Sequence, residues 1–177
     1  MKVKIVCCLV LLLISCSHQP PKSIHNACDL AKEKKRWYKA AKRTQKKWGV
    51  PVHVQWAIIH KESHFRAKAQ AKTSSAYGFC QATKATWKHY QEDTGRPFAR
   101  RDNFSDCSDF IGWYGHRVKK KLGIKKHQAK NLYLVYHEGI AGFRKGKHKK
   151  SKALLRYANE VESIAKKYQK QLKQCKK

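Results

Sequence analysis

The segment PVHVQWAIIHKESHF, residues 51–65, decides the fold and also places the chemistry. Pro51 suits the first turn of a helix, where its missing N–H group costs nothing. Four residues then recur at helical spacing on one face: Val52, Trp56, Ile59 and Ser63. We therefore predict a helix that begins near Pro51 and carries Glu62 in its last turn, beside an apolar stripe.

Helical periodicity continues on both sides of this segment. Further helices are predicted over about 28–48, 83–90, 105–123, 128–137 and 151–173. Between them, residues 68–81 are small, polar or Gly-containing and predict a loop or a small β-hairpin. A glycine cluster at 139–146 predicts a turn before the last helix. The expected fold class is mainly α, with one domain over residues 27–177.

The first 16 residues have the features of an export signal. Lys2 and Lys4 precede an apolar run, residues 5–14, that is too short to span a bilayer. The sequence LISC at 13–16 resembles a bacterial lipobox, in which Cys16 is acylated and becomes the mature N-terminus. We expect residues 1–15 to be the signal peptide and residues 16–26, with two prolines, to be a lipidated tether. An ordinary secretory peptide cut nearby is the alternative.

The sequence therefore predicts an exported protein. Ser17 follows the lipobox cysteine, which by resemblance to lipoproteins favours anchoring in the outer membrane, facing the periplasm. In this oxidising compartment cysteines pair. Three of the seven cysteines lie in the signal peptide and lipobox, which leaves four: Cys28, Cys80, Cys107 and Cys175.

Four cysteines allow three disulfide connectivities. We favour Cys28 with Cys175, which ties the two ends of the domain, and Cys80 with Cys107, which fastens the loop at Gly78 to the next helix. A zinc site is less favoured, because no two of these residues have C-x₂₋₄-C spacing. No metal or cofactor motif is present in the sequence, so none is expected.

Positive charge dominates the composition, with 41 Lys and Arg against 11 Asp and Glu and a formal net charge of +30. A field of this size attracts polyanions. Nucleic acid is not expected, because the chain is predicted to be exported and carries no recognisable nucleic-acid-binding motif. Acidic cell wall, anionic lipid headgroups and lipopolysaccharide phosphates are the candidate partners, whereas no protein partner is indicated. The alternative is that each basic run is simply a solvated face.

Glu62 is the candidate catalytic group. The negative end of the helix dipole and burial beside Ile59 or Phe65 would both raise its pKa. A glutamic acid that stays protonated near neutral pH can protonate the departing oxygen of a glycosidic bond. The alternative is a surface Glu62 paired with Lys61 or Arg66.

Three ordered blocks, ES at 62–63, GFCQ at 78–81 and YHEG at 136–139, resemble the catalytic domain of the soluble lytic transglycosylases (SLT). That domain has an α+β lysozyme-like fold of the goose type, and the resemblance covers residues 48–166. It implies cleavage of the β-1,4 bond between N-acetylmuramic acid and N-acetylglucosamine in peptidoglycan. The product would be a 1,6-anhydro sugar.

The resemblance also assigns roles to individual residues. Glu62 would be the catalytic acid and then the base, and Gln81 would hydrogen-bond the substrate near the cleavage point. Gly78 would keep the loop backbone close to the sugar, while Tyr136 would line the cleft. Further residues expected to contact the substrate are Ser63, Tyr77, Phe79, Tyr114, His137 and Glu138.

The third block departs from the family pattern, which commonly has Tyr-Asn where this chain has Tyr136-His137, followed by Glu138. The extra carboxylate suggests an alternative, a muramidase in which Glu138 activates water about 6.5–9.5 Å from Glu62. A third possibility is a non-catalytic, cationic lipoprotein that binds cell wall or membrane.

Overall fold

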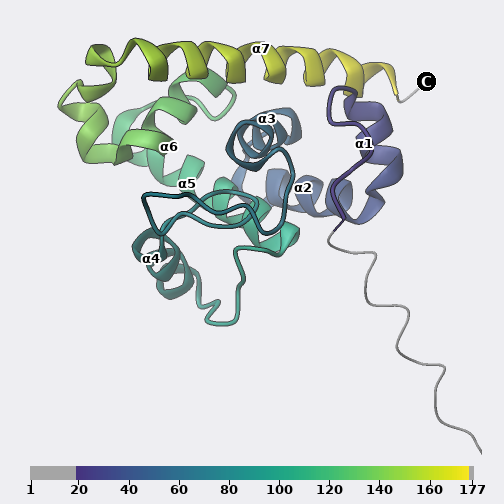
Figure 1. Ribbon diagram of the computed structural model, residues 1–177, viewed down its shortest axis with the longest axis horizontal. Coiled ribbons are helices and arrows are strands. Elements are labelled where there is room, and N and C mark those ends of the chain that lie inside the picture. Colours follow the sequence, from purple (N-terminus) through teal and green to yellow (C-terminus); the bar gives the residue numbers. More distant parts are fainter. Residues whose placement is uncertain (1–18, 176–177) are drawn as a thin grey trace, which may run out of the picture.

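The computed structural model describes residues 19–175 and confirms a mainly α, lysozyme-like fold (Figure 1). The predicted signal peptide and Cys16 lie outside the described residues. The elements are, in order, α1 Ala27–Glu33, α2 Lys35–Trp48, α3 Val52–Ser63, α4 Lys84–Thr94, α5 Phe104–Leu122, α6 Ala129–Arg144, the 3₁₀ turn η2 Lys147–Lys150 and α7 Lys152–Gln174. No helix in the range 19–175 is both long enough and apolar enough to cross a bilayer.

Helix α3 occupies the centre of the domain. It contacts α2, α5, α6 and α7, and Figure 1 shows it nearly end-on beneath α7. The predicted apolar face is buried, and so are Val54, Gln55, Ala57 and Ile58 on its other sides. A helix that is apolar nearly all round is a core helix. Its position therefore depends on packing from every direction.

One buried amide joins three helices. The side chain of Gln55 on α3 donates to the carbonyl oxygens of Ala41 (3.0 Å) and Val50 (2.7 Å). Its own oxygen accepts a hydrogen bond from Ser108 Oγ of α5 at 2.6 Å. Because buried polar groups are costly unless bonded, this network fixes α3 against α2 and α5.

A second polar centre, Asp109 on α5, holds α4. Its carboxylate accepts hydrogen bonds from Trp48 Nε1 (2.9 Å) and Tyr90 Oη (2.8 Å), and it pairs with Arg96 at 3.0 Å. Burial alone would raise the pKa of this carboxyl, but these partners outweigh burial and lower it. Helix α4, which borders the candidate site, is thereby tied to α5.

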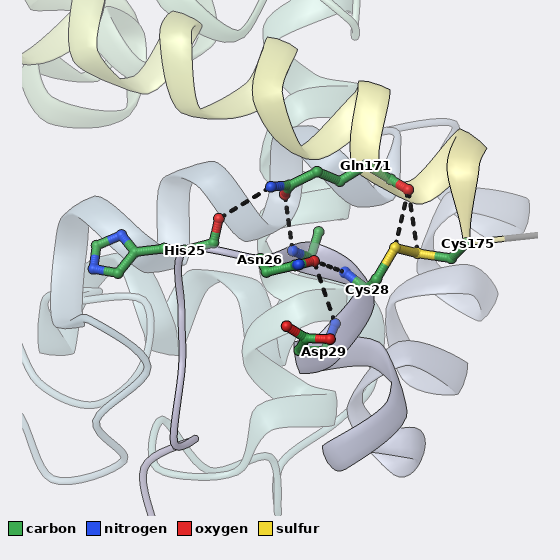
Figure 2. The surroundings of a disulfide bond; sticks show 7 residues. His25, Asn26, Cys28, Asp29, Gln171 and Cys175 are labelled. Carbon is green, nitrogen blue, oxygen red and sulfur yellow. Dashed lines mark hydrogen bonds between the residues drawn. A yellow bond between two sulfur atoms is a disulfide. The ribbon is translucent and has the colours of Figure 1, made fainter.

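The two ends of the domain are joined as predicted, by a disulfide between Cys28 and Cys175. Figure 2 shows this disulfide and, beside it, the hydrogen bonds of Gln171 on α7. Its side-chain oxygen accepts from the backbone N–H of Ala27 (2.9 Å), and its nitrogen donates to the carbonyl of His25 (3.2 Å). The last helix is therefore held to the start of the fold by covalent and polar bonds together.

Residues 19–26, which belong to the predicted tether, make contacts with the domain. From Gln19 onward the chain lies on the domain: Lys34 Nζ donates to the Gln19 carbonyl at 3.0 Å, and Tyr168 Oη donates to the Ile24 carbonyl. Asn26 caps α1. These bonds to α7 and to the α1–α2 junction are long-range contacts, which local sequence composition does not reveal.

Two predicted boundaries were wrong. The expected helix over 28–48 is two helices that break at Lys34, because α1 packs on α7 whereas α2 packs mainly on α5. Helix α6 continues past 137 by bending at Gly139 (φ 71°, ψ 162°). Helix α5, predicted from about 105, begins at Phe104 and is capped by Asn103. In the loop region, the β structure of the described chain consists of isolated bridges, Gln70 with Tyr77 and Tyr77 with Ala82.

Removing the disulfide should destabilise the domain strongly. Its cysteines are 147 residues apart, so the bond restricts a very large loop of the unfolded chain. We expect the double variant Cys28→Ser/Cys175→Ser to lose about 3–5 kcal/mol of unfolding free energy in urea. Reductant should lower the unfolding free energy of the wild type to that of the double variant. It should leave the unfolding free energy of the variant unchanged. Equal stability of wild type and variant under oxidising conditions would contradict this role.

Candidate active site

A cleft of about 430 Å³ opens beside the end of α3. Its walls are the loop over 71–83, the start of α4, one side of α5 and the bend of α6 at Gly139. The structure brings six of the predicted site residues together on this cleft: Glu62, Gln81, Tyr114, Tyr136, His137 and Glu138. These residues come from α3, the loop, α5 and α6, so only the folded chain forms the site.

The chain turns sharply directly after Glu62. Helix α3 ends with two successive non-glycine residues in the left-handed region, His64 (φ 52°) and Phe65 (φ 59°). Such conformations persist where the surrounding packing fixes them. Phe65 is fully buried among aromatic rings, including Trp37 and Trp56, which holds the turn. Packing of Phe65 thus determines where α3 stops and where the Glu62 carboxyl lies.

The environment of Glu62 keeps its carboxyl protonated. Burial raises the pKa of Glu62 from 4.5 to about 8, opposed in part by a hydrogen bond from Tyr133 and by the charge of Lys61. The alternative of a surface residue paired with Lys61 or Arg66 is wrong, because Lys61 pairs instead with Glu160. At neutral pH the carboxyl is therefore a proton donor.

Tyr133 is a site residue that sequence reasoning missed. It is buried on α6, and it donates a hydrogen bond to Glu62; burial and the neighbouring Glu62 raise the pKa of the phenol far above its usual value. Tyr133 and Tyr136 are three residues apart, so both lie on the same side of α6. This spacing could have indicated from the sequence that Tyr133 belongs to the site. An aromatic residue at helical spacing, however, usually indicates only core packing.

Hydrogen bonds to the backbone fix the loop that faces Glu62. Tyr136 Oη donates to the carbonyl of Cys80 at 2.5 Å, and Ser63 Oγ donates to the carbonyl of Phe79 at 2.7 Å. The side-chain nitrogen of Gln81 donates to the carbonyls of Ala69 and Gly78, each at 2.9 Å. Gln81 itself is in the left-handed region (φ 47°). The loop is therefore preorganised against α3 and α6.

Three residues predicted to contact the substrate belong to this scaffold instead. Ser63 is fully buried and bonds the loop backbone, so its predicted contact with substrate was wrong. Phe79 is buried against Trp37 and Phe104. Tyr77 packs under the guanidinium of Arg101 and does not line the cleft.

Gly78 is required by the backbone. It has φ +81°, and a Cβ atom there would lie 2.0 Å from the carbonyl oxygen of Arg101. The close approach that needs glycine is therefore to the segment before α5. The predicted role of Gly78 in keeping the loop backbone close to the sugar stays a prediction.

The second predicted disulfide is not formed. Cys80 and Cys107 are free thiols, both fully buried, and they are hydrogen-bonded to each other. Burial raises the pKa of Cys107 well above its usual value, which keeps it a protonated thiol. Because thiol oxidation proceeds through the exposed thiolate, this site is protected from it.

The cleft is acidic although the protein is strongly basic. Its two acidic residues are Glu62 and Glu138, and no Lys or Arg lines it. In the described part of the chain, the ion-pair partner of Glu138 is His137 (Nδ1 to Oε1, 3.5 Å) rather than a Lys or Arg. Residues 19–175 contain no cluster of three His, Cys, Asp or Glu that could hold a metal ion.

A helical domain with a desolvated glutamic acid at the end of its central helix, facing an open cleft, is of the lysozyme-like class. A family model described as Transglycosylase SLT domain matches residues 4–175, and the chain therefore belongs to that family. This is a lytic transglycosylase family, and its substrate is peptidoglycan. Comparison with curated proteins gave no match.

The raised pKa of Glu62 predicts a stability cost that depends on pH. In the unfolded chain the carboxyl ionises near 4.5 but in the folded protein only near 8, so the folded protein loses stability as pH rises between these values. We expect Glu62→Gln to be more stable than wild type by about 1–3 kcal/mol at pH 8 and equal to it near pH 4. Urea unfolding at both pH values measures this.

The control for this prediction is Glu92→Gln, which changes an exposed carboxylate on α4. It should leave the unfolding free energy nearly unchanged at both pH values. A Glu62→Gln variant that is less stable than wild type at pH 8 would contradict a desolvated, protonated Glu62.

Proposed function

We propose that the protein is a peptidoglycan lytic transglycosylase. It cleaves the β-1,4 bond between N-acetylmuramic acid and N-acetylglucosamine and forms 1,6-anhydro-N-acetylmuramic acid. The main support is the Glu62 carboxyl, which lines the cleft and is kept protonated by burial. The chain also belongs to the Transglycosylase SLT domain family.

In the proposed reaction Glu62 acts twice. Its proton moves to the glycosidic oxygen as the bond from that oxygen to muramyl C1 breaks. The resulting carboxylate then takes the proton of the muramyl 6-hydroxyl while that oxygen bonds to C1, which restores the acid without consuming water. A pKa of about 8 suits both steps near neutral pH, because the group is protonated at the start and basic once ionised. Tyr133 stabilises the intervening carboxylate by its hydrogen bond.

Other cleft residues would hold the glycan. Gln81 is fixed by its bonds to the loop carbonyls, which suits a hydrogen-bonding role near the cleavage point. The ring of Tyr114 is anchored by its hydroxyl, which donates to the Val135 carbonyl at 3.0 Å, and offers a surface for a sugar. His137 and Glu138 would contact substrate where α6 bends.

A second candidate function is a muramidase. It is favoured by Glu138, a cleft carboxylate that makes no ion pair with Lys or Arg within residues 19–175. In this reaction Glu138 would activate a water molecule that attacks C1, and Glu62 would remain the acid. The product would have a reducing end instead of an anhydro ring.

We further propose that the protein is exported and anchored through lipid on Cys16 to the outer membrane, facing the periplasm. The lipobox-like sequence and the serine at position 17 support this location. The disulfide between Cys28 and Cys175 is also consistent with an oxidising compartment.

Digestion of purified peptidoglycan tests the proposed reaction. Muropeptides released by wild type, Glu62→Gln and Glu138→Gln are identified by mass spectrometry. We expect anhydro products from wild type and Glu138→Gln, and a loss of rate of about 10²–10⁴-fold in Glu62→Gln, because the proton donor is removed.

Other products would identify the alternatives. Reducing ends that disappear in Glu138→Gln would replace the transglycosylase proposal by the muramidase. Intact peptidoglycan that binds wild type tightly would leave a non-catalytic wall-binding protein and contradict both enzymatic proposals.

A further inference from the structure

Helix α2 presents a cationic face without a single acidic residue. Its sequence is KRWYKAAKRTQKKW, and Trp37, Ala40, Ala41 and Thr44 face the core. Every charged residue of the helix is basic and exposed: Lys35, Arg36, Lys39, Lys42, Arg43, Lys46 and Lys47. Among the described residues, only Lys47 of this set forms an ion pair, with Asp109 at 3.3 Å.

This charge distribution destabilises the helix itself. Lys39 has Lys35, Arg36, Lys42 and Arg43 as neighbours three or four positions away, and like charges at these spacings repel. Lys35 and Arg36, which begin the helix, also lie at the positive end of its dipole. An anion from outside the chain would remove this repulsion, so the face is suited to an anionic surface.

The face also contains a hollow suited to phosphate groups. It measures about 350 Å³ and lies between α2 and the start of α5, with Arg36, Lys39 and Arg43 along one wall. The acidic residue on its rim, Asp102, already pairs with Arg100 at 2.9 Å. Guanidinium groups bind phosphate oxygens in pairs, and they lose less hydration than ammonium groups when they do so.

The start of the described chain lies beside this helix. Gln19 is held by Lys34, the residue immediately before α2. Gln19 is three positions from Cys16 in the sequence, a span of at most about 11 Å. A lipid on Cys16 would therefore bring the start of α2 to the level of the headgroups. The beginning of α7 is at the other end of the molecule (Figure 1).

We propose that the cationic face of α2 docks on anionic phospholipid headgroups, with Arg36, Lys39 and Arg43 receiving their phosphates. The position of this face next to the bilayer rests on the lipid anchor proposed above and is independent of catalysis. Juxtamembrane basic residues are attracted to anionic lipid in this way, and the attraction is sensitive to salt.

Chemical acetylation of lysines tests the docking on the mature, full-length protein. The protein is mixed with vesicles of phosphatidylcholine alone or with added phosphatidylglycerol, treated with acetic anhydride and mapped by mass spectrometry. With anionic vesicles, acetylation of Lys39, Lys42 and Lys46 should slow by about fivefold or more. Lys149, Lys150 and Lys152, near the start of α7, are the internal control and should react at unchanged rates. The protection should vanish in 1 M NaCl.

Two matched variants sharpen the test. Arg36→Gln/Arg43→Gln should lose most of the protection, whereas Lys149→Gln/Lys150→Gln, which removes the same charge elsewhere, should keep it. Equal protection of both lysine sets, or protection by soluble peptidoglycan fragments but not by vesicles, would overturn membrane docking.

The lipid anchor is tested separately by retention on vesicles in 1 M NaCl, which screens charge but does not extract lipid. If the protein is retained on vesicles in 1 M NaCl but its α2 lysines are not protected from acetylation at low salt, docking is refuted and the lipid anchor is supported. If the α2 lysines are protected from acetylation at low salt but the protein leaves the vesicles in 1 M NaCl, docking is supported and the lipid anchor is refuted.

Discussion

The desolvation of the Glu62 carboxyl is the constraint on which the rest of the structure depends. Burying an acid is unfavourable, and the packing of α3 against α2, α5, α6 and α7 fixes Glu62 beside the cleft in spite of this cost. Gln55 ties that helix to α2 and α5 through buried hydrogen bonds. The stability given up at Glu62 is offset elsewhere, notably by the disulfide that joins α1 to α7.

The same packing prepares the cleft around Glu62. Ser63 and Tyr136 each bond a backbone carbonyl of the 78–81 segment, so the loop is fixed from α3 and from α6. In the described chain, three residues other than glycine have a left-handed backbone: His64, Phe65 and Gln81. All three lie close to this region in the sequence. Rigid support of this kind is what positions an acid accurately against a sugar polymer.

The sequence allowed prediction of the helical fold, of the disulfide between Cys28 and Cys175, and of a cleft containing Glu62 and Gln81. These predictions succeeded because periodicity and motif order reflect which helix faces meet. The roles of Ser63 and Phe79 were wrong, since adjacency to a motif does not reveal whether a side chain points to the cleft or to the core. Tyr133 was missed because its hydrogen bond to Glu62 arises only when α6 packs against α3.

The most direct test of this account is the ionisation of Glu62 itself. Carbon-13 NMR of protein labelled at the glutamate side-chain carboxyls, with Glu62→Gln to assign the signal, follows each group over pH. We expect a titration near pH 8 for Glu62 and a higher midpoint in Tyr133→Phe, which lacks the hydrogen bond that favours the carboxylate. A Glu62 midpoint near 4.5 would contradict the account, because the carboxyl would then be an ionised, solvated group at neutral pH.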